Sequence, residues 1–214
     1  MVPSGGRVGP RTRRINGHSS MKHCAWLLAL ALVSCSERAE PRQLPTTVVD
    51  SIHPVEEEIR RFKAQLTGPP PVALAGGAST IDSLVVRFVS ALQQHDTAEI
   101  GELALTSWEF IELYYPTSQY TRPPYRQSPG LLWFLIQQNS QKGRTRTLAR
   151  LGGRDLGYRG VECPTAPHTP GENRLWQGCV VRLDAEGSAD RIRLFGTILE
   201  RAGQFKFISY ANDF

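Results

Sequence analysis

The chain has 214 residues, of which 40% are hydrophobic and 21% are charged, and its formal net charge is +5. The positive charge comes from residues 1–34, which hold five Lys and Arg residues and no Asp or Glu; the remainder holds 20 basic residues against 20 acidic ones. A neutral remainder has no general attraction for phosphate backbones, so composition argues against a nucleic-acid-binding protein. The 180 residues after position 34 are enough for one domain with one core.

Residues 21–34 have the pattern of a secretory signal peptide. Met21 and Lys22 precede Cys24–Val33, a run of ten uncharged and mostly apolar residues. The run is too short to cross a bilayer comfortably, because a spanning helix needs about 20 apolar residues. A retained membrane anchor is therefore disfavoured. A buried core helix is disfavoured because the next thirty residues are polar and rich in Pro, so we expect export.

The end of this segment, Leu32-Val33-Ser34-Cys35, resembles the bacterial lipobox. The resemblance implies that the Cys35 sulfur receives a diacylglycerol and that the chain is cut just before it. Ser36 follows where an Asp would hold many Gram-negative lipoproteins at the inner membrane. We therefore expect a membrane-anchored protein of the cell envelope, on the outer membrane and facing the periplasm.

The regions that flank this segment are polar. We interpret residues 1–20 as a disordered upstream extension and residues 35–53 as a flexible tether interrupted by prolines. Residues 54–66 predict an amphipathic helix, because acidic residues crowd its start and basic residues its end, and apolar side chains recur along one stripe: Val55, Ile59, Phe62 and Leu66. Such a short helix must dock on its own domain, on a partner or on a membrane. Residues 67–79 form a Pro- and Gly-containing linker.

Residues 80–214 predict a domain that begins with helices. Thr80 or Ser79 is placed to cap a helix through Leu92, and Asp96 ends it or caps the next. Further short helices are expected over residues 97–105 and 108–115, before a loop over 116–128. Ser128-Pro129 starts another helix, which we expect to close near Gly143.

The second half of this region predicts strands separated by turns. The expected strands cover residues 144–151, 158–163, 174–183, 192–200 and 204–210. In the third strand, alternation puts Leu175 on one face with Cys179, Val181 and Leu183. Helices followed by antiparallel strands predict an α+β fold, with the helices packed on one face of a curved antiparallel sheet.

After Cys24 and Cys35 are set aside, Cys163 and Cys179 remain as a pair. An exported chain favours a disulfide between them, and two buried free thiols are the alternative. If Cys163 faces Cys179 across an antiparallel pair, Val161 faces Val181 on the same side, so the register is self-consistent.

The order of elements resembles the nuclear-transport-factor-2-like, or cystatin-like, superfamily, whose fold is cone-shaped. The residues that carry the resemblance are the helix Leu84–Asp96, the aromatic and acidic stretch Trp108–Tyr115 and the closing strands over 192–210. The resemblance implies a pocket at the mouth of the cone, which binds small molecules or is lost in members that only assemble.

The candidate pocket or catalytic residues are aromatic or acidic: Trp108, Glu109, Glu112, Tyr114, Tyr115, Tyr120 and Trp133. A carboxylate beside aromatic rings loses hydration, which raises its pKa and suits it to act as a base. The alternative is structural, because Trp108, Ile111 and Tyr115 have the spacing of a helix face in a core, which leaves both glutamates beside it in solvent.

No His, Cys, Asp and Glu residues have metal-ligand spacing, and we expect no metal and no cofactor. Five arginines between positions 144 and 159 suggest either an anion or lipid-headgroup patch or the solvent side of edge strands: Arg144, Arg146, Arg150, Arg154 and Arg159.

Three functions remain open. The first is a non-enzymatic, lipid-anchored module that binds a small apolar ligand or an envelope protein. The second is an isomerase- or cyclase-type enzyme that uses Glu109 or Glu112 with a tyrosine. The third is a structural or assembly lipoprotein. An open apolar pocket without an acid of shifted pKa would favour the first function. A deep pocket lined by a desolvated carboxylate and a tyrosine hydroxyl would favour the second. A pocket filled by Trp and Phe side chains would favour the third.

Overall fold

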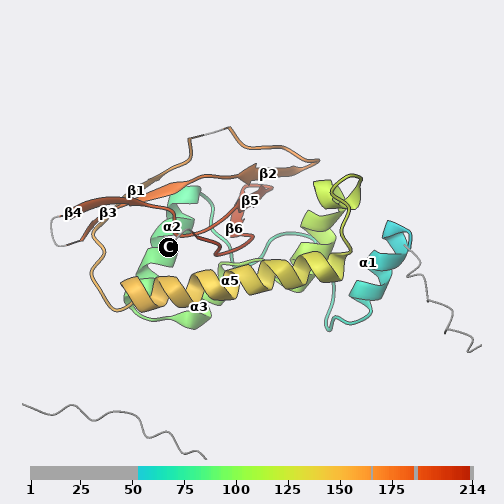
Figure 1. The fold of residues 1–214 in the computed structure, drawn as a ribbon, viewed down its shortest axis with the longest axis horizontal. Helices are drawn as coiled ribbons and strands as arrows, with labels where there is room; N and C mark the ends of the chain where they lie inside the picture. The colour runs from blue at the N-terminus through green and yellow to red at the C-terminus, as the bar shows by residue number, and fades with distance from the viewer. Residues whose placement is uncertain (1–52, 165, 186–187, 213–214) are drawn as a thin grey trace, which may run out of the picture. The chain divides into compact units, whose positions relative to one another are not determined.

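The computed structural model describes residues 53–212 except 165, 186 and 187 (Figure 1). The predicted extension, signal peptide, Cys35 and nearly all of the tether lie outside the described residues. Residues 50–214 form one compact unit. The fold is α+β, as expected, with the helices first and antiparallel strands afterwards.

The helices begin and end mostly where caps and prolines predict. Thr80 caps α2, and its hydroxyl accepts a hydrogen bond from Ser83 N at 3.0 Å. The Asp96 carboxylate caps α3 by accepting hydrogen bonds from Ala98 N and Glu99 N. The α-helices are α1 (Val55–Lys63), α2 (Ile81–Gln93), α3 (Thr97–Glu102), α4 (Ser107–Glu109) and α5 (Pro129–Leu151), with a π-helical turn over Phe110–Tyr114 and 3-10 turns over Tyr115–Thr117 and Gln119–Thr121.

The amphipathic helix α1 docks on its own domain. Phe62 is buried, and its ring centroid lies 5.8 Å from that of Phe110. Lys63 Nζ forms an ion pair with Glu112 Oε1 at 2.8 Å. These contacts confirm the intramolecular alternative for this helix.

The prediction that a helix closes near Gly143 and that residues 144–151 form a strand is wrong. α5 continues to Leu151 and contributes side chains to both cores of the domain. Gly143 is needed for close packing rather than for a helix end, because a Cβ there would lie 1.7 Å from Tyr210 O. Thr147, one turn on, is buried and donates to Gly143 O at 2.9 Å. Tertiary packing thus overrides the local signals of glycine and β-branched residues.

The described strands form two antiparallel sheets of three strands each, not the single curved sheet predicted. Their orders are β1-β3-β4 and β2-β5-β6 (Figure 1). The strands are β1 (Tyr158–Glu162), β2 (Asn173–Trp176), β3 (Val180–Ala185), β4 (Ser188–Ile192), β5 (Ile198–Arg201) and β6 (Gln204–Phe207).

The strands predicted over 174–183 and 192–200 are each divided between the two sheets. Trp176 pairs with Ile198 in one sheet, and Val181 pairs with Ile192 in the other. Between these two pairs, one segment has five residues, 193–197, and the facing segment has four, 177–180. The extra residue interrupts the hydrogen-bond ladder. Gly178 has a φ of +67° at this break, a conformation that L side chains rarely adopt.

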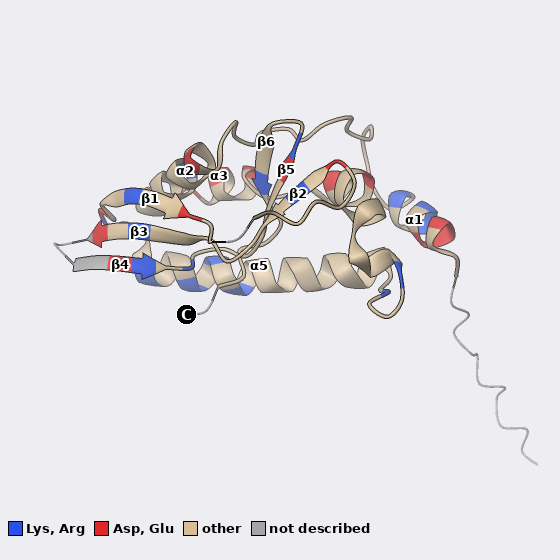
Figure 2. Ribbon diagram, turned by 90° about the horizontal axis from the view of Figure 1, so that it is seen from above, with Lys and Arg blue, Asp and Glu red and all other residues tan. Residues whose placement is uncertain are grey.

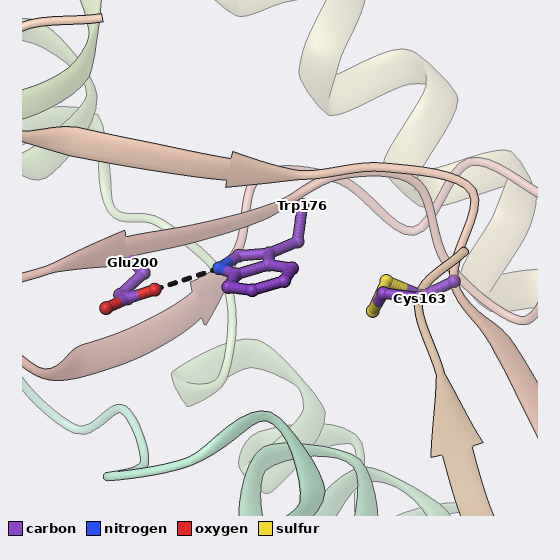
Figure 3. Close-up of a disulfide and its surroundings, with 4 residues drawn as sticks. Cys163, Trp176 and Glu200 are labelled. Atoms are coloured by element: carbon purple, nitrogen blue, oxygen red, sulfur yellow. Dashed lines mark hydrogen bonds between the residues drawn. A yellow bond between two sulfur atoms is a disulfide. The ribbon is translucent and has the colours of Figure 1, made fainter. Parts of the chain in front are cut away.

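The disulfide between Cys163 and Cys179 is present and joins the end of β1 to the start of β3. Val161 pairs with Val181, so both the bond and its register are confirmed. Figure 3 shows the Trp176 indole between this disulfide and Glu200, to which Nε1 donates at 2.9 Å. The disulfide therefore sits beside the break between the two sheets.

Two buried clusters hold the domain together. The first packs α2 against the β1-β3-β4 sheet and the C-terminal aromatics Phe195, Phe207 and Tyr210. The second gathers Phe110 and Tyr115 with residues of α1, α5 and the other sheet. Leu175 belongs to the second cluster, whereas Cys179, Val181 and Leu183 belong to the first. The prediction that these four share one face is therefore wrong, because the strand breaks between them.

Candidate functional site

A cavity of about 400 Å³ lies where the 110–121 segment meets the first half of α5 and the β2-β5-β6 sheet. We call it the Tyr114 cavity. Its floor is apolar and comes from the second core, through Leu132, Ile136, Leu175 and Ile208. The lining is completed by Tyr114, Ser118, Gln119, Tyr120, His168, Pro170, Gln177, Thr197 and Ser209.

The wide π-helical turn and the 3-10 turns after it build one wall. Phe110 and Tyr115 are fully buried in the second core, whereas Tyr114 lines the cavity. Tyr115 Oη donates to Gln127 O at 2.7 Å, and Ser118 Oγ donates to Tyr115 O at 2.8 Å. These bonds fix the turns that carry Gln119 and Tyr120.

The opposite wall is held by a backbone bridge and a buried amide. His168 N donates to Leu175 O at 3.0 Å, and Leu175 N donates to His168 O at 2.8 Å, so His168 is fixed beside β2. Buried Asn173 Nδ2 donates to Leu113 O at 2.7 Å and to Thr117 Oγ1 at 3.0 Å. The amide therefore joins β2 to the wall that carries Tyr114.

The lining of the Tyr114 cavity is rich in neutral polar side chains. None of the described residues that line it is Asp, Glu, Lys or Arg. Burial, and to a smaller extent nearby Tyr120, raises the pKa of Tyr114 to about 12, so the phenol is a neutral hydrogen-bonding group.

Most polar side chains of the lining are uncommitted. Among the described residues, Ser118 is the only polar lining residue whose side chain hydrogen-bonds to protein. The other polar side chains of the lining form no hydrogen bond with the described residues: Tyr114, Gln119, Tyr120, His168, Gln177, Thr197 and Ser209.

Glu109, predicted as a pocket carboxylate, lies elsewhere, in a buried ion pair. Its Oε2 is 2.9 Å from Lys206 Nζ, and the two side chains are 2% and 1% exposed. Glu109 also accepts hydrogen bonds from Ala75 N and Thr106 N, each at 2.8 Å. These three contacts tie the carboxylate to Lys206 and to two backbone amides, and Glu109 does not line the Tyr114 cavity.

The other predicted residues are also dispersed. Glu112 pairs with Lys63 at 2.8 Å, and Trp108 Nε1 donates to Thr67 O at 2.7 Å, so both hold α1 and its linker. Trp133 packs on Phe110 and lines a separate groove of about 480 Å³ between α1 and α5. Of the predicted set, the cavity contains only Tyr114 and Tyr120.

Sequence reasoning missed the side chains that face the tyrosines. These side chains stand outside the observed strands: His168, Gln177, Thr197 and Ser209. The last three fall in segments predicted as strands, where no alternation singles them out. Their one sequence signal is composition, since these segments interrupt the apolar runs.

The arginine cluster does not form one strand face. Arg144, Arg146 and Arg150 lie on α5, while Arg159 lies on β1 and pairs with Asp184 at 2.9 Å. The prediction that the cluster forms the solvent side of edge strands is therefore wrong for the first three, because their segment is helical.

The described part of the chain contains no group of three or more His, Cys, Asp or Glu side chains placed to hold a metal ion. No described helix is long and apolar enough to cross a membrane.

Comparisons with protein-family models, with curated proteins and with solved structures found no match to this chain. The likenesses to the lipobox and to the nuclear-transport-factor-2-like superfamily therefore stay predictions that depend on the residues quoted for them.

Proposed function

We propose that this protein is an exported, lipid-anchored module of a cell envelope whose domain binds a small uncharged ligand in the Tyr114 cavity. The observation that carries the binding function is the combination of an apolar floor, uncommitted polar side chains and no charged residue among the described lining. The proposed anchor is a diacylglycerol on Cys35.

Two features support this localisation. Residues 21–35 have the order of a lipoprotein signal peptide. The Cys163–Cys179 disulfide is the second, because disulfides persist in exported proteins and are rare in reducing cytosol. Both features are expected of a protein that matures in an oxidising envelope compartment.

The lining defines the chemistry of the ligand. A volume of about 400 Å³ suits a small molecule, and its apolar floor favours a ligand with an apolar body. A charged ligand would lose its hydration without gaining an Asp, Glu, Lys or Arg partner from the described lining, which is costly. A neutral ligand with a few hydroxyl, ether or amide groups instead satisfies Tyr114, Gln119 and Gln177.

Binding is favoured over the isomerase or cyclase alternative. As predicted from the sequence, such chemistry would use Glu109 or Glu112 as a base within hydrogen-bond reach of the ligand. Glu109 is held by Lys206, and Glu112 is paired with Lys63. The described lining of the Tyr114 cavity supplies neither of them.

We also propose a nuclear-transport-factor-2-like arrangement for residues 80–214. Its support is the order of helices before antiparallel strands and an apolar-floored cavity between them. The division into two three-stranded sheets is a departure from the single curved sheet of that fold. An experimental structure of the domain that resembles no member of the superfamily would remove this part of the proposal.

Binding of N-phenyl-1-naphthylamine, an uncharged aromatic amine that fluoresces in apolar surroundings, tests the ligand site. We expect saturable binding to the wild type. Ile136→Trp should weaken binding by about tenfold or more, because the larger side chain occupies part of the cavity and excludes the probe from the apolar floor. Tyr114→Phe keeps the ring and removes the hydroxyl, so we expect a smaller loss.

The matched control is Tyr125→Phe, which alters an exposed tyrosine outside the Tyr114 cavity. Its affinity for the probe should equal that of the wild type. Melting temperatures establish that each variant is folded. Non-saturable binding, or equal affinity for folded Ile136→Trp and the wild type, would contradict the proposed site.

A further inference from the structure

The outward face of α5 carries an exposed apolar end. Leu131, Phe134 and Leu135 are 50%, 55% and 39% exposed, although each is a large hydrophobic side chain. Their spacing of three and four residues places them on one stripe of the helix. Leu132 and Ile136, on the opposite side, are buried in the second core. The side chains of this stripe therefore do not belong to the core of the domain.

The same stripe becomes basic towards the end of the helix. Continuing the helical spacing leads from Leu135 through Gln138 and Lys142 to Arg146, all exposed. α5 has four basic residues and no Asp or Glu along its length, and Figure 2 shows blue but no red on its ribbon. An apolar end followed by a cationic end is the pattern of a helix that lies on a membrane surface.

We propose that this face of α5 lies against a lipid bilayer that contains anionic headgroups. Leu131, Phe134 and Leu135 insert at the boundary between headgroups and acyl chains. Lys142 and Arg146 extend along the surface and contact lipid phosphates, with their apolar stems against the boundary. The helix does not cross the membrane; it lies on it.

The point where the tether enters the domain favours a bilayer as the occupant. The His53 carbonyl accepts a hydrogen bond from the Arg126 guanidinium. His53 also lines the α1–α5 groove together with Ser128, Pro129 and Gly130, at the start of α5. The chain from residue 52 back to Cys35 therefore joins the domain beside the apolar end of the stripe.

The length of that segment keeps the domain near its anchor. The 17 residues from 36 to 52 span at most roughly 60 Å when fully extended. A surface that binds lipid only weakly is then held at a high effective concentration of lipid. This proximity depends on the Cys35 anchor proposed above, whereas the affinity of α5 for lipid does not, so the two are tested separately.

The test uses residues 36–214, which lack Cys35 and retain the whole compact unit, Asp50–Phe214. Binding is measured by flotation with vesicles of phosphatidylcholine alone, or with about one third phosphatidylglycerol. We expect partitioning about tenfold stronger on the anionic vesicles, and weaker at high salt.

Two double variants separate the apolar from the electrostatic contribution. Phe134→Ser with Leu135→Ser should lower partitioning about tenfold on anionic vesicles, because it removes the inserted surface. Lys142→Gln with Arg146→Gln should lower it by a similar factor on anionic vesicles and leave the weak binding to neutral ones unchanged. The matched control is Val86→Ser, which removes a 42% exposed apolar side chain on α2. It should leave the partitioning onto both kinds of vesicle unchanged.

The proposal is overturned if the wild type does not bind anionic vesicles, or if folded stripe variants bind as the wild type does. A wild type that is dimeric, does not bind vesicles and becomes monomeric in Phe134→Ser with Leu135→Ser would assign the stripe to a second copy of the chain instead. Neither result depends on lipidation of Cys35.

Discussion

Lys206 Nζ lies 2.9 Å from Glu109 Oε2, in a pair of side chains that are 1% and 2% exposed. Lys206 also donates to Ala75 O at 2.7 Å, and Glu109 accepts from Ala75 N at 2.8 Å. The pair thus joins β6 to α4 and fixes the backbone of the linker before α2. Its role is to hold three distant segments together.

Glu109→Gln and Lys206→Met should each destabilise the domain, because each leaves the other group buried without its charge partner. We expect a loss of about 3–5 kcal/mol in the free energy of unfolding for each single variant. The double variant should lose less than the sum of the two. Urea titrations give the free energy of unfolding of the wild type, the two single variants and the double variant. Losses that add up in the double variant would contradict the coupling of the pair.

The disulfide should stabilise the domain mainly through the unfolded state. Cys163 and Cys179 are 16 positions apart, and a closed loop of that size contributes about 3 kcal/mol in the chain-entropy model. We expect the Cys163→Ala, Cys179→Ala double variant to lose about this amount. A reductant should lower the stability of the wild type and leave the double variant unchanged; equal sensitivity of both would contradict the assignment.

Alkaline pH should destabilise the fold through buried phenols. The pKa of Tyr114 is raised from 10.0 to about 12 by burial, and burial also raises the pKa of Tyr210. Below pH 10 both states keep the proton of Tyr114; between about 10 and 12 the unfolded chain loses it first, so stability falls as pH rises.

Across that window, the titration of Tyr114 should lower the free energy of unfolding by about 3 kcal/mol, because its pKa is raised from 10.0 to about 12 in the folded state. Tyr114→Phe removes the titrating group and should flatten the pH dependence accordingly. The measurement is the free energy of unfolding against pH. An unchanged slope in the variant would show that the phenol titrates normally in the folded protein.

Two glycines of α5 should respond oppositely to alanine. A Cβ at Gly143 would lie 1.7 Å from Tyr210 O, whereas one at Gly130 would meet nothing within 4 Å. Gly143→Ala should therefore cost about 1–3 kcal/mol or more through overpacking. Gly130→Ala should be neutral or stabilising by up to about 1 kcal/mol. Equal melting temperatures for the two variants would contradict the close approach of α5 and the C-terminal segment.

Local signals were sufficient for much of the fold. The caps at Thr80 and Asp96 and the apolar stripe of α1 predicted helices that the structure confirms. The pairing of Val161 with Val181 followed from placing Cys163 opposite Cys179. At the two caps and in α1, neighbouring residues determine the conformation, whereas the register of β1 and β3 could be predicted because the two cysteines identify its partners.

The remaining features depend on distant contacts. Gly143 has the local signal of a helix end, yet it stays helical because Tyr210 O packs against it. Glu109 has the sequence context of a desolvated base, and its partner Lys206 is 97 positions away. The Tyr114 cavity combines a helical turn with loop residues such as His168 and Gln177, which no periodicity links.

The most direct test of the central claim is the intact mass of the protein extracted from membranes of a Gram-negative host, beside Cys35→Ala. The proposed anchor predicts that the wild type begins at Cys35 and carries added acyl mass, whereas the variant carries none. A wild type that retains Met21 or residues 1–20 without acylation would contradict the lipid anchor and the proposed location in the cell envelope.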